Sequence, residues 1–115
     1  MSLQQIMAEL RKDYVASMPE KIRNIGNFWT AGKLEELRNE FHKLKGTGTT
    51  YGMPEVTSLG LTMEKICKGK PDSLKEAMPI ANKALQRIYE LRSQNQEIPA
   101  EGLSELAQLQ KLETP

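Results

Sequence analysis

Apolar residues recur at intervals of three and four along almost the whole chain, and no segment shows the alternation typical of a β-strand. The first stripe predicts a helix from about Leu3 to about Phe28, with Ser2 as its N-cap. Its members are Leu3, Ile6 or Met7, Leu10, Tyr14, Ser17 or Met18, Ile22, Ile25 and Phe28 or Trp29. Pro19 interrupts the stripe without shifting its phase, which favours one kinked helix over two separate ones.

Three further stripes follow. The second begins at Leu34 with Leu34, Leu37, Phe41 and Leu44, and its rhythm predicts a helix that persists to about Tyr51 through two glycines, although each costs about 1 kcal/mol relative to alanine. The alternative interpretation makes this glycine-rich end a loop. The third helix is expected from Pro54 to Gly69, and the fourth begins near Pro71 or Asp72, with a second candidate kink at Pro79.

Four amphipathic helices joined by short connections predict an all-α fold, an antiparallel up-and-down four-helix bundle over residues 1–95. Residues 96–115 form a C-terminal tail. Its leucines, spaced by three, are Leu103, Leu106, Leu109 and Leu112. They predict a short extra helix from about Glu101 to Leu112 that packs on the bundle or docks elsewhere; the alternative is a tail that frays.

Composition narrows the function classes. The 115 residues carry a net charge of +1, which gives little support for binding to nucleic acid. A single Cys and a single His exclude a disulfide framework, a thiolate-clustered zinc site and a His-rich metal centre, so we expect neither metal nor cofactor. No stretch approaches the roughly 20 apolar residues that span a bilayer. We therefore expect a soluble, cytoplasmic monomer without membrane insertion.

One group of residues carries candidate chemistry. The only histidine, His42, follows Phe41, so a buried Phe41 places His42 about 100° around the helix and partly exposed. Arg38 and Lys45 share its face, and Gly46 leaves bare backbone beside it. This arrangement suits a ring nitrogen that accepts a phosphoryl group, since one ammonium about 6 Å away contributes roughly 1 to 3 kcal/mol per unit charge. The alternative is an ordinary solvated side chain.

Two short segments resemble a known family. The string His42-Lys43-Leu44-Lys45-Gly46, followed by Gly48 and Gly52, resembles the phospho-acceptor segment of histidine-containing phosphotransfer (HPt) domains. The segment Leu61-Thr62-Met63-Glu64 is similar to a second stretch of that family and of the N-terminal domain of chemotaxis histidine kinases. The two stretches lie in the second and third predicted helices, which make up about a third of the chain; the first and fourth helices agree only in pattern.

The resemblance implies that His42 is the phospho-acceptor. From their places on the same helix face, we expect Lys45 to stabilise the phosphoryl charge, Gly46 to give steric access and Arg38 to act as a secondary cation. Glu64 is implied to hydrogen-bond the other ring nitrogen and orient the histidine. The implied partners are a response-regulator receiver domain, which supplies the metal and the acidic pocket, and a sensor or hybrid histidine kinase. The chain itself has no GxxxxGK[ST] nucleotide loop.

Helix geometry tests the Glu64 assignment. If the second helix continues to about Tyr51, His42 lies about nine residues before the turn and Glu64 ten residues past Pro54, so the two sit at the same height. If that helix ended at Gly46, the heights would differ by roughly 9 Å. The alternative interpretation of Glu64 is an exposed charge paired with Lys68 or Arg38.

The same residues leave three functions open. The first hypothesis is a free-standing phosphorelay carrier without autonomous catalysis, which passes a phosphoryl group to or from a receiver aspartate. The second is the phospho-accepting domain of a larger chemotaxis-type histidine kinase. The third is a non-catalytic helical adaptor.

Gly48 and Gly60 are interpreted as close helix contacts, because small residues allow two helix backbones to approach. Cys67 is interpreted as a small core residue.

Overall fold

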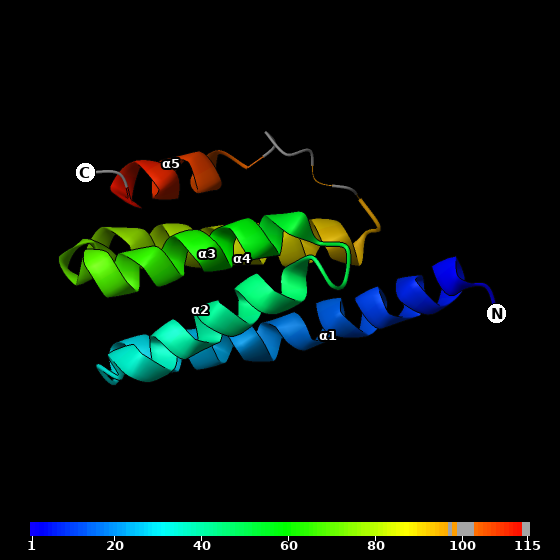
Figure 1. Cartoon of the computed structure of the whole chain (residues 1–115), viewed down its shortest axis with the longest axis horizontal. Helices are drawn as coiled ribbons and strands as arrows, with labels where there is room; N and C mark the ends of the chain where they lie inside the picture. The colour runs from blue at the N-terminus through cyan, green and yellow to red at the C-terminus, as the bar shows by residue number, and fades with distance from the viewer. Residues whose placement is uncertain (97, 99–102, 114–115) are drawn as a thin grey trace.

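Successive helices run in opposite directions along the long axis of the molecule (Figure 1). The computed structural model describes residues 1–96, 98 and 103–113. Its helices are α1 (Leu3–Thr30), α2 (Leu34–Gly48), α3 (Pro54–Gly69), the 3-10 turn η1 (Pro71–Ser73), α4 (Leu74–Ser93) and α5 (Ser104–Glu113). The described ranges contain no strand. The predicted all-α, antiparallel bundle is confirmed.

The amino terminus of α1 is set by a capping box. Ser2 Oγ accepts a hydrogen bond from the backbone N–H of Gln5 at 3.2 Å, and Gln5 Oε1 accepts one from the Ser2 N–H at 2.9 Å. The predicted N-cap is thus confirmed. Pro19 lies inside α1, which continues as one helix on either side of it. A single helix rather than two is what the unbroken apolar phase indicated.

The first turns of α1 extend beyond the other helices (Figure 1). The prediction that Leu3, Ile6 and Leu10 belong to the buried stripe is wrong, because these side chains are 74%, 41% and 42% exposed. The helix has 28 residues and is about 42 Å long, whereas the 15 residues of α2 span only about 22 Å. Leu34, at the start of α2, is also exposed, contrary to the prediction.

The carboxyl end of α2 differs from the prediction by three residues. The helix ends at Gly48, not Tyr51. The chain nevertheless stays in hydrogen-bonded turns, since the Tyr51 N–H donates to the Thr47 carbonyl at 3.2 Å. It leaves this path at Gly52, whose φ of +73° favours glycine. The turn between α2 and α3 therefore lies nearly as far along the helix axis as it would after a helix that ended at Tyr51.

One core joins all five helices. Its fully buried large side chains come from every helix and from the α2–α3 turn: Met18, Leu37, Phe41, Met53, Val56, Leu59, Met63, Ile66, Leu74, Leu85, Ile88 and Leu109. Helix α5 packs on α3 and α4, and its approach residue Leu103 belongs to the same cluster. The short C-terminal helix thus packs on the bundle; its predicted start at Glu101 lies outside the described residues. Within those residues, no helix is long and apolar enough to cross a membrane.

Candidate functional site

His42 stands on the outer edge of α2. Its side chain is 58% exposed, whereas Phe41 and Leu44 on the same helix are buried in the core. These two apolar anchors fix the rotation of α2 about its axis, and that rotation carries the imidazole to the surface. The exposure agrees with the expectation drawn from the helical phase of Phe41.

A buried carboxylate on α3 holds the inner side of the ring. Glu64 has a side chain that is only 4% exposed, and its Oε2 lies 2.5 Å from His42 Nδ1. Its other oxygen, Oε1, accepts a hydrogen bond from Lys45 Nζ at 2.8 Å. A carboxylate accepts from a protonated Nδ1, so in the neutral ring the proton sits on Nδ1 and Nε2 keeps its lone pair.

Two glycines bring α2 and α3 close enough for this contact. A Cβ at Gly60 would lie 2.5 Å from the backbone N of Lys45 and 2.6 Å from the carbonyl oxygen of Phe41. A Cβ at Gly48 would meet the backbone N of Thr57 at 2.5 Å. Both positions were predicted as close helix contacts, and both are confirmed. Because helical side chains lean toward the amino terminus, Glu64 reaches back along α3 to this close approach.

Charge and burial act in opposite directions on Glu64. The hydrogen bond from Lys45 holds the pKa of this carboxyl below its ordinary value, burial opposes the shift by disfavouring the charged form, and the hydrogen bond with His42 lowers the pKa further. The result is a carboxylate that remains ionised at neutral pH. A fixed negative charge therefore lies under the exposed imidazole.

The sequence matches the model of a known protein family. The Hpt domain family model matches residues 9–113, nearly the whole chain. The chain belongs to the Hpt domain family. Hpt domains carry out histidine phosphotransfer in two-component signalling and are phosphoryl carriers rather than catalysts. No curated protein and no solved structure matches the sequence significantly.

The remaining predicted site residues of this Hpt domain lie around the imidazole in different ways. Gly46 is exposed, and a Cβ placed there would meet nothing within 4 Å. Arg38 is on the same helix, with its Nη2 4.0 Å from Glu35 Oε1. The structure therefore joins His42 and Lys45 through Glu64, which contacts both, and leaves Gly46 open, while Arg38 pairs with Glu35.

The alternative interpretation of Glu64 as an exposed charge is wrong, since its carboxylate is buried and bound to Lys45. Cys67, predicted as a small core residue, is partly buried and packs against the core from its margin. Burial raises the pKa of its thiol to about 11, the Arg38 charge opposes this rise and the Glu64 charge adds to it. A thiol with this pKa is almost wholly protonated at neutral pH and thus a poor nucleophile.

Sequence reasoning missed the contacts that hold the end of α2. Thr57 Oγ1 accepts from the Thr49 N–H at 2.7 Å and so ties the last turn of α2 to α3. On the α1 side, the Tyr14 hydroxyl lies 2.8 Å from Thr47 Oγ1, and the Tyr14 ring stacks on Tyr51 at 4.7 Å. The sequence contained no periodic signal for these pairs, because each joins residues on different elements.

Proposed function

We propose that this Hpt domain is a phosphorelay carrier in which His42 exchanges a phosphoryl group with the aspartate of a response-regulator receiver domain. The observation that supports the proposal is the exposed imidazole of His42, whose Nδ1 is bound by the buried carboxylate of Glu64 at 2.5 Å. A ring held in this way presents Nε2 outward in the form that carries a lone pair.

The proposed transfer step uses this geometry. The Nε2 lone pair of His42 attacks the phosphorus of a receiver's aspartyl phosphate, an N–P bond forms, and the P–O bond to the aspartate breaks, so the aspartate leaves as a carboxylate. The proton on Nδ1 stays in its hydrogen bond with Glu64. The positive charge that develops on the ring is offset by the Glu64 carboxylate. The reverse step passes the group to a receiver aspartate.

The neighbouring residues take supporting roles in the proposal. Lys45 is 32% exposed and bound to Glu64, so its ammonium orients that carboxylate, and we assign its positive charge to stabilising the phosphoryl group. Gly46 leaves the approach open for a receiver domain. Arg38 contributes a secondary positive charge to the same helix face. The donor is a phosphorylated receiver or a sensor or hybrid histidine kinase.

The test is intact mass spectrometry of the chain after exposure to phosphorylated receiver domains. We expect the gain of one phosphoryl group, stable to alkali and labile to acid, and its loss in His42→Gln. Because the His42 side chain is exposed, this substitution should leave the thermal melting curve close to that of the original chain. Labelling only by ATP and a kinase catalytic module would instead favour the kinase-domain alternative. No label from any cognate donor would favour the adaptor.

A further inference from the structure

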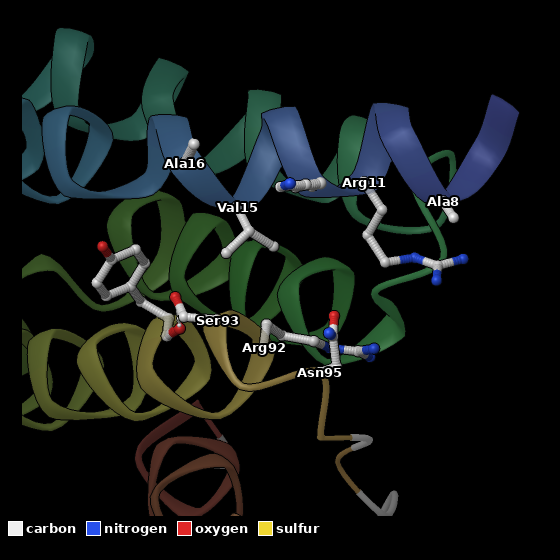
Figure 2. A pocket seen from close by; sticks show the side chains of 9 residues that line it. Ala8, Arg11, Val15, Ala16, Arg92, Ser93 and Asn95 are labelled. Carbon is white, nitrogen blue, oxygen red and sulfur yellow. Dashed lines mark hydrogen bonds between the residues drawn. The ribbon is translucent and has the colours of Figure 1, made fainter. Parts of the chain in front are cut away.

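A second candidate site lies between α1 and the carboxyl end of α4. A cleft of about 490 Å³ opens there, and Figure 2 shows Arg11 and Val15 on α1 facing Arg92 and Asn95 across it. None of His42, Lys45 or Glu64 lines this cleft. Its volume falls in the range of small-molecule pockets, about 300 to 1,000 Å³.

The polar side of the cleft is positively charged. Three of its lining residues are cations, Arg11, Lys12 and Arg92, and no acidic residue is among those that line it. Arg92 is already paired with Glu55, at 2.7 Å from Nε and 2.9 Å from Nη2. In the described part of the chain, by contrast, no carboxylate lies within 4 Å of Arg11 or Lys12. Two positive charges are therefore left for an anion.

Backbone contacts position Arg11 and Asn95 at the cleft. Arg11 Nε donates to the Tyr51 carbonyl at 2.8 Å, which fixes the guanidinium plane and leaves its two terminal nitrogens for another acceptor. Asn95 follows α4 with a φ of +56°, and the Gln96 N–H closes the helix end by donating to the Leu91 carbonyl at 3.0 Å. This cap places the Asn95 amide at the mouth of the cleft (Figure 2).

Farther along α1, the lining of the cleft becomes apolar. Val15 and Ala16 come from α1, and Tyr89 comes from α4. The small side chain of Ala16 leaves room beside α1, and the ring of Tyr89 offers a surface on which a second ring can stack. The cleft thus combines an anion-attracting end with an apolar wall, which is the composition of a site for an amphipathic small molecule.

We propose that this cleft binds a small organic anion that carries one phosphate or carboxylate head on an aromatic or similarly apolar body. The head lies between Arg11 and Lys12, where charge-assisted hydrogen bonds are available, and the Asn95 amide adds a further donor. The body packs against Val15 and Tyr89. Binding here does not involve the imidazole, so the site is separate from the phosphotransfer site.

The experiment is a titration of the full isotope-labelled chain, followed by amide NMR shifts, with phenyl phosphate and with benzoate. Inorganic phosphate serves as the head-only probe and benzyl alcohol as the body-only probe. We expect saturable shifts at Lys12, Ala16 and Ser93 with at least one of the two amphipathic anions, much weaker binding of inorganic phosphate, and none of benzyl alcohol. The preferred anion then distinguishes a phosphate from a carboxylate ligand.

Two variants test the cleft without disturbing the fold. Lys12→Met removes an exposed charge and should weaken binding about tenfold, the effect of one charge-assisted hydrogen bond. Asn95→Gly removes the amide while keeping the left-handed cap that glycine prefers, and should weaken binding severalfold. Arg11 is unsuitable as a variant because it also supports the α2–α3 turn.

The matched controls are Lys75→Met, an exposed lysine of α4 outside the cleft, and His42→Gln; both should bind as the original chain does. Equal affinity in Lys12→Met and the original chain, shifts confined to residues around His42, or absence of saturable binding would each overturn the proposal. So would binding of an acidic peptide in place of both small anions. None of these results would alter the outcome of the phosphotransfer experiment on His42.

Discussion

Two buried glutamates, one between α2 and α3 and one between α4 and α5, are both kept ionised away from water, but by different partners. The side chains of Glu64 and Glu105 are each 4% exposed. The pKa of Glu64 is lowered chiefly by Lys45. Burial, the largest single influence, raises the pKa of Glu105, but the hydrogen bond from Arg87, a backbone hydrogen bond and the nearby charges of Arg87 and Lys83 together hold this pKa below its ordinary value. Both carboxylates are therefore ionised at neutral pH.

The difference lies in what shares the negative charge. Arg87 Nη1 contacts both oxygens of Glu105, at 2.8 and 2.9 Å, so one cation satisfies the carboxylate and joins α5 to α4. Glu64 instead divides its oxygens between Lys45 and the exposed ring of His42. A buried carboxylate with a lowered pKa is thus not in itself a reactive site. The exposed, titratable partner is what distinguishes α2–α3 from α4–α5.

The largest expected effect is on the rate of phosphoryl transfer, when the negative charge of Glu64 is removed and that of Glu105 is removed for comparison. Glu64→Gln should slow phosphoryl transfer to His42 by roughly 10 to 100-fold, by analogy with the loss of carboxylates that orient metal-binding histidines. Glu105→Gln should leave the transfer rate within a factor of about two and instead lower the free energy of unfolding by roughly 1 to 3 kcal/mol. Single-turnover transfer from a phosphorylated receiver and urea unfolding measure the two quantities. Equal transfer rates in the two variants would show that Glu64 has no more to do with phosphoryl transfer than Glu105 has.

The two glycines that flank the site should respond in opposite directions. Gly60→Ala places a methyl group 2.5 Å from the Lys45 backbone and should destabilise the fold by roughly 1 to 3 kcal/mol. Gly46→Ala meets open space inside a helix and should stabilise it by about 0.5 to 1 kcal/mol. Thermal unfolding of both variants measures the contrast.

A larger side chain at Gly46 tests access rather than stability. Gly46→Trp should weaken docking of a receiver domain, measured by calorimetric titration, while the bundle unfolds near its original temperature. Gly26→Trp is a matched control, since a Cβ there also meets nothing within 4 Å and Gly26 lies on α1. Normal receiver affinity in Gly46→Trp would exclude Gly46 from the docking surface.

Lys45→Met should have a smaller effect than Glu64→Gln. The substitution removes the hydrogen bond to Glu64 Oε1 and one positive charge from the site, but leaves the contact between Glu64 and His42. We expect transfer to slow about tenfold, the lower end of the effect of one charged hydrogen bond. Lys43→Met, an exposed lysine paired with Glu40, is the control and should transfer at the original rate. The same rate in both variants would remove Lys45 from the site.

The smallest expected effect is on the pH dependence of stability. The pKa values of Glu64 and Glu105 are lowered in the folded chain, so the folded state binds fewer protons than the unfolded state in acid. Their contribution is present above about pH 4.3, the ordinary glutamate value, and is lost as the pH falls through the folded pKa values. Urea unfolding between pH 3 and 6 should show this loss, and Glu105→Gln should show a shallower one. If the free energy of unfolding of Glu105→Gln depended on pH as steeply as that of the original chain, the contribution assigned to Glu105 would be contradicted.

Much of the bundle could be predicted from local pattern. The recurrence of Leu37, Phe41 and Leu44 gave the buried face of α2, and with it the exposure of His42. The apolar periodicity failed at Leu3 and Ile6, because a helical stripe continues in sequence where no neighbouring helix remains to cover it. The apolar pattern of one helix does not show where its neighbouring helices end, because that depends on how the bundle packs.

The candidate site was predictable in its members and less so in its contacts. The resemblance named His42, Lys45 and Glu64, and helix heights indicated that His42 and Glu64 meet. The hydrogen bond of Lys45 with Glu64 was not anticipated, and neither was the pairing of Arg38 with Glu35. Long side chains on one helix face have several partners within reach, and the sequence does not rank them.

By itself the sequence determined the helical periods, the N-cap at Ser2, the proline in the first turn of α3, and the position of one histidine beside a buried phenylalanine. These properties depend on residues within about one helical turn in the sequence, so a short segment is enough to predict them. The tertiary structure decided that Glu64 is buried, that it divides its charge between two groups of α2, and that a cationic cleft opens between α1 and α4. Those features arise from contacts between residues far apart in the chain, and only packing selects among them.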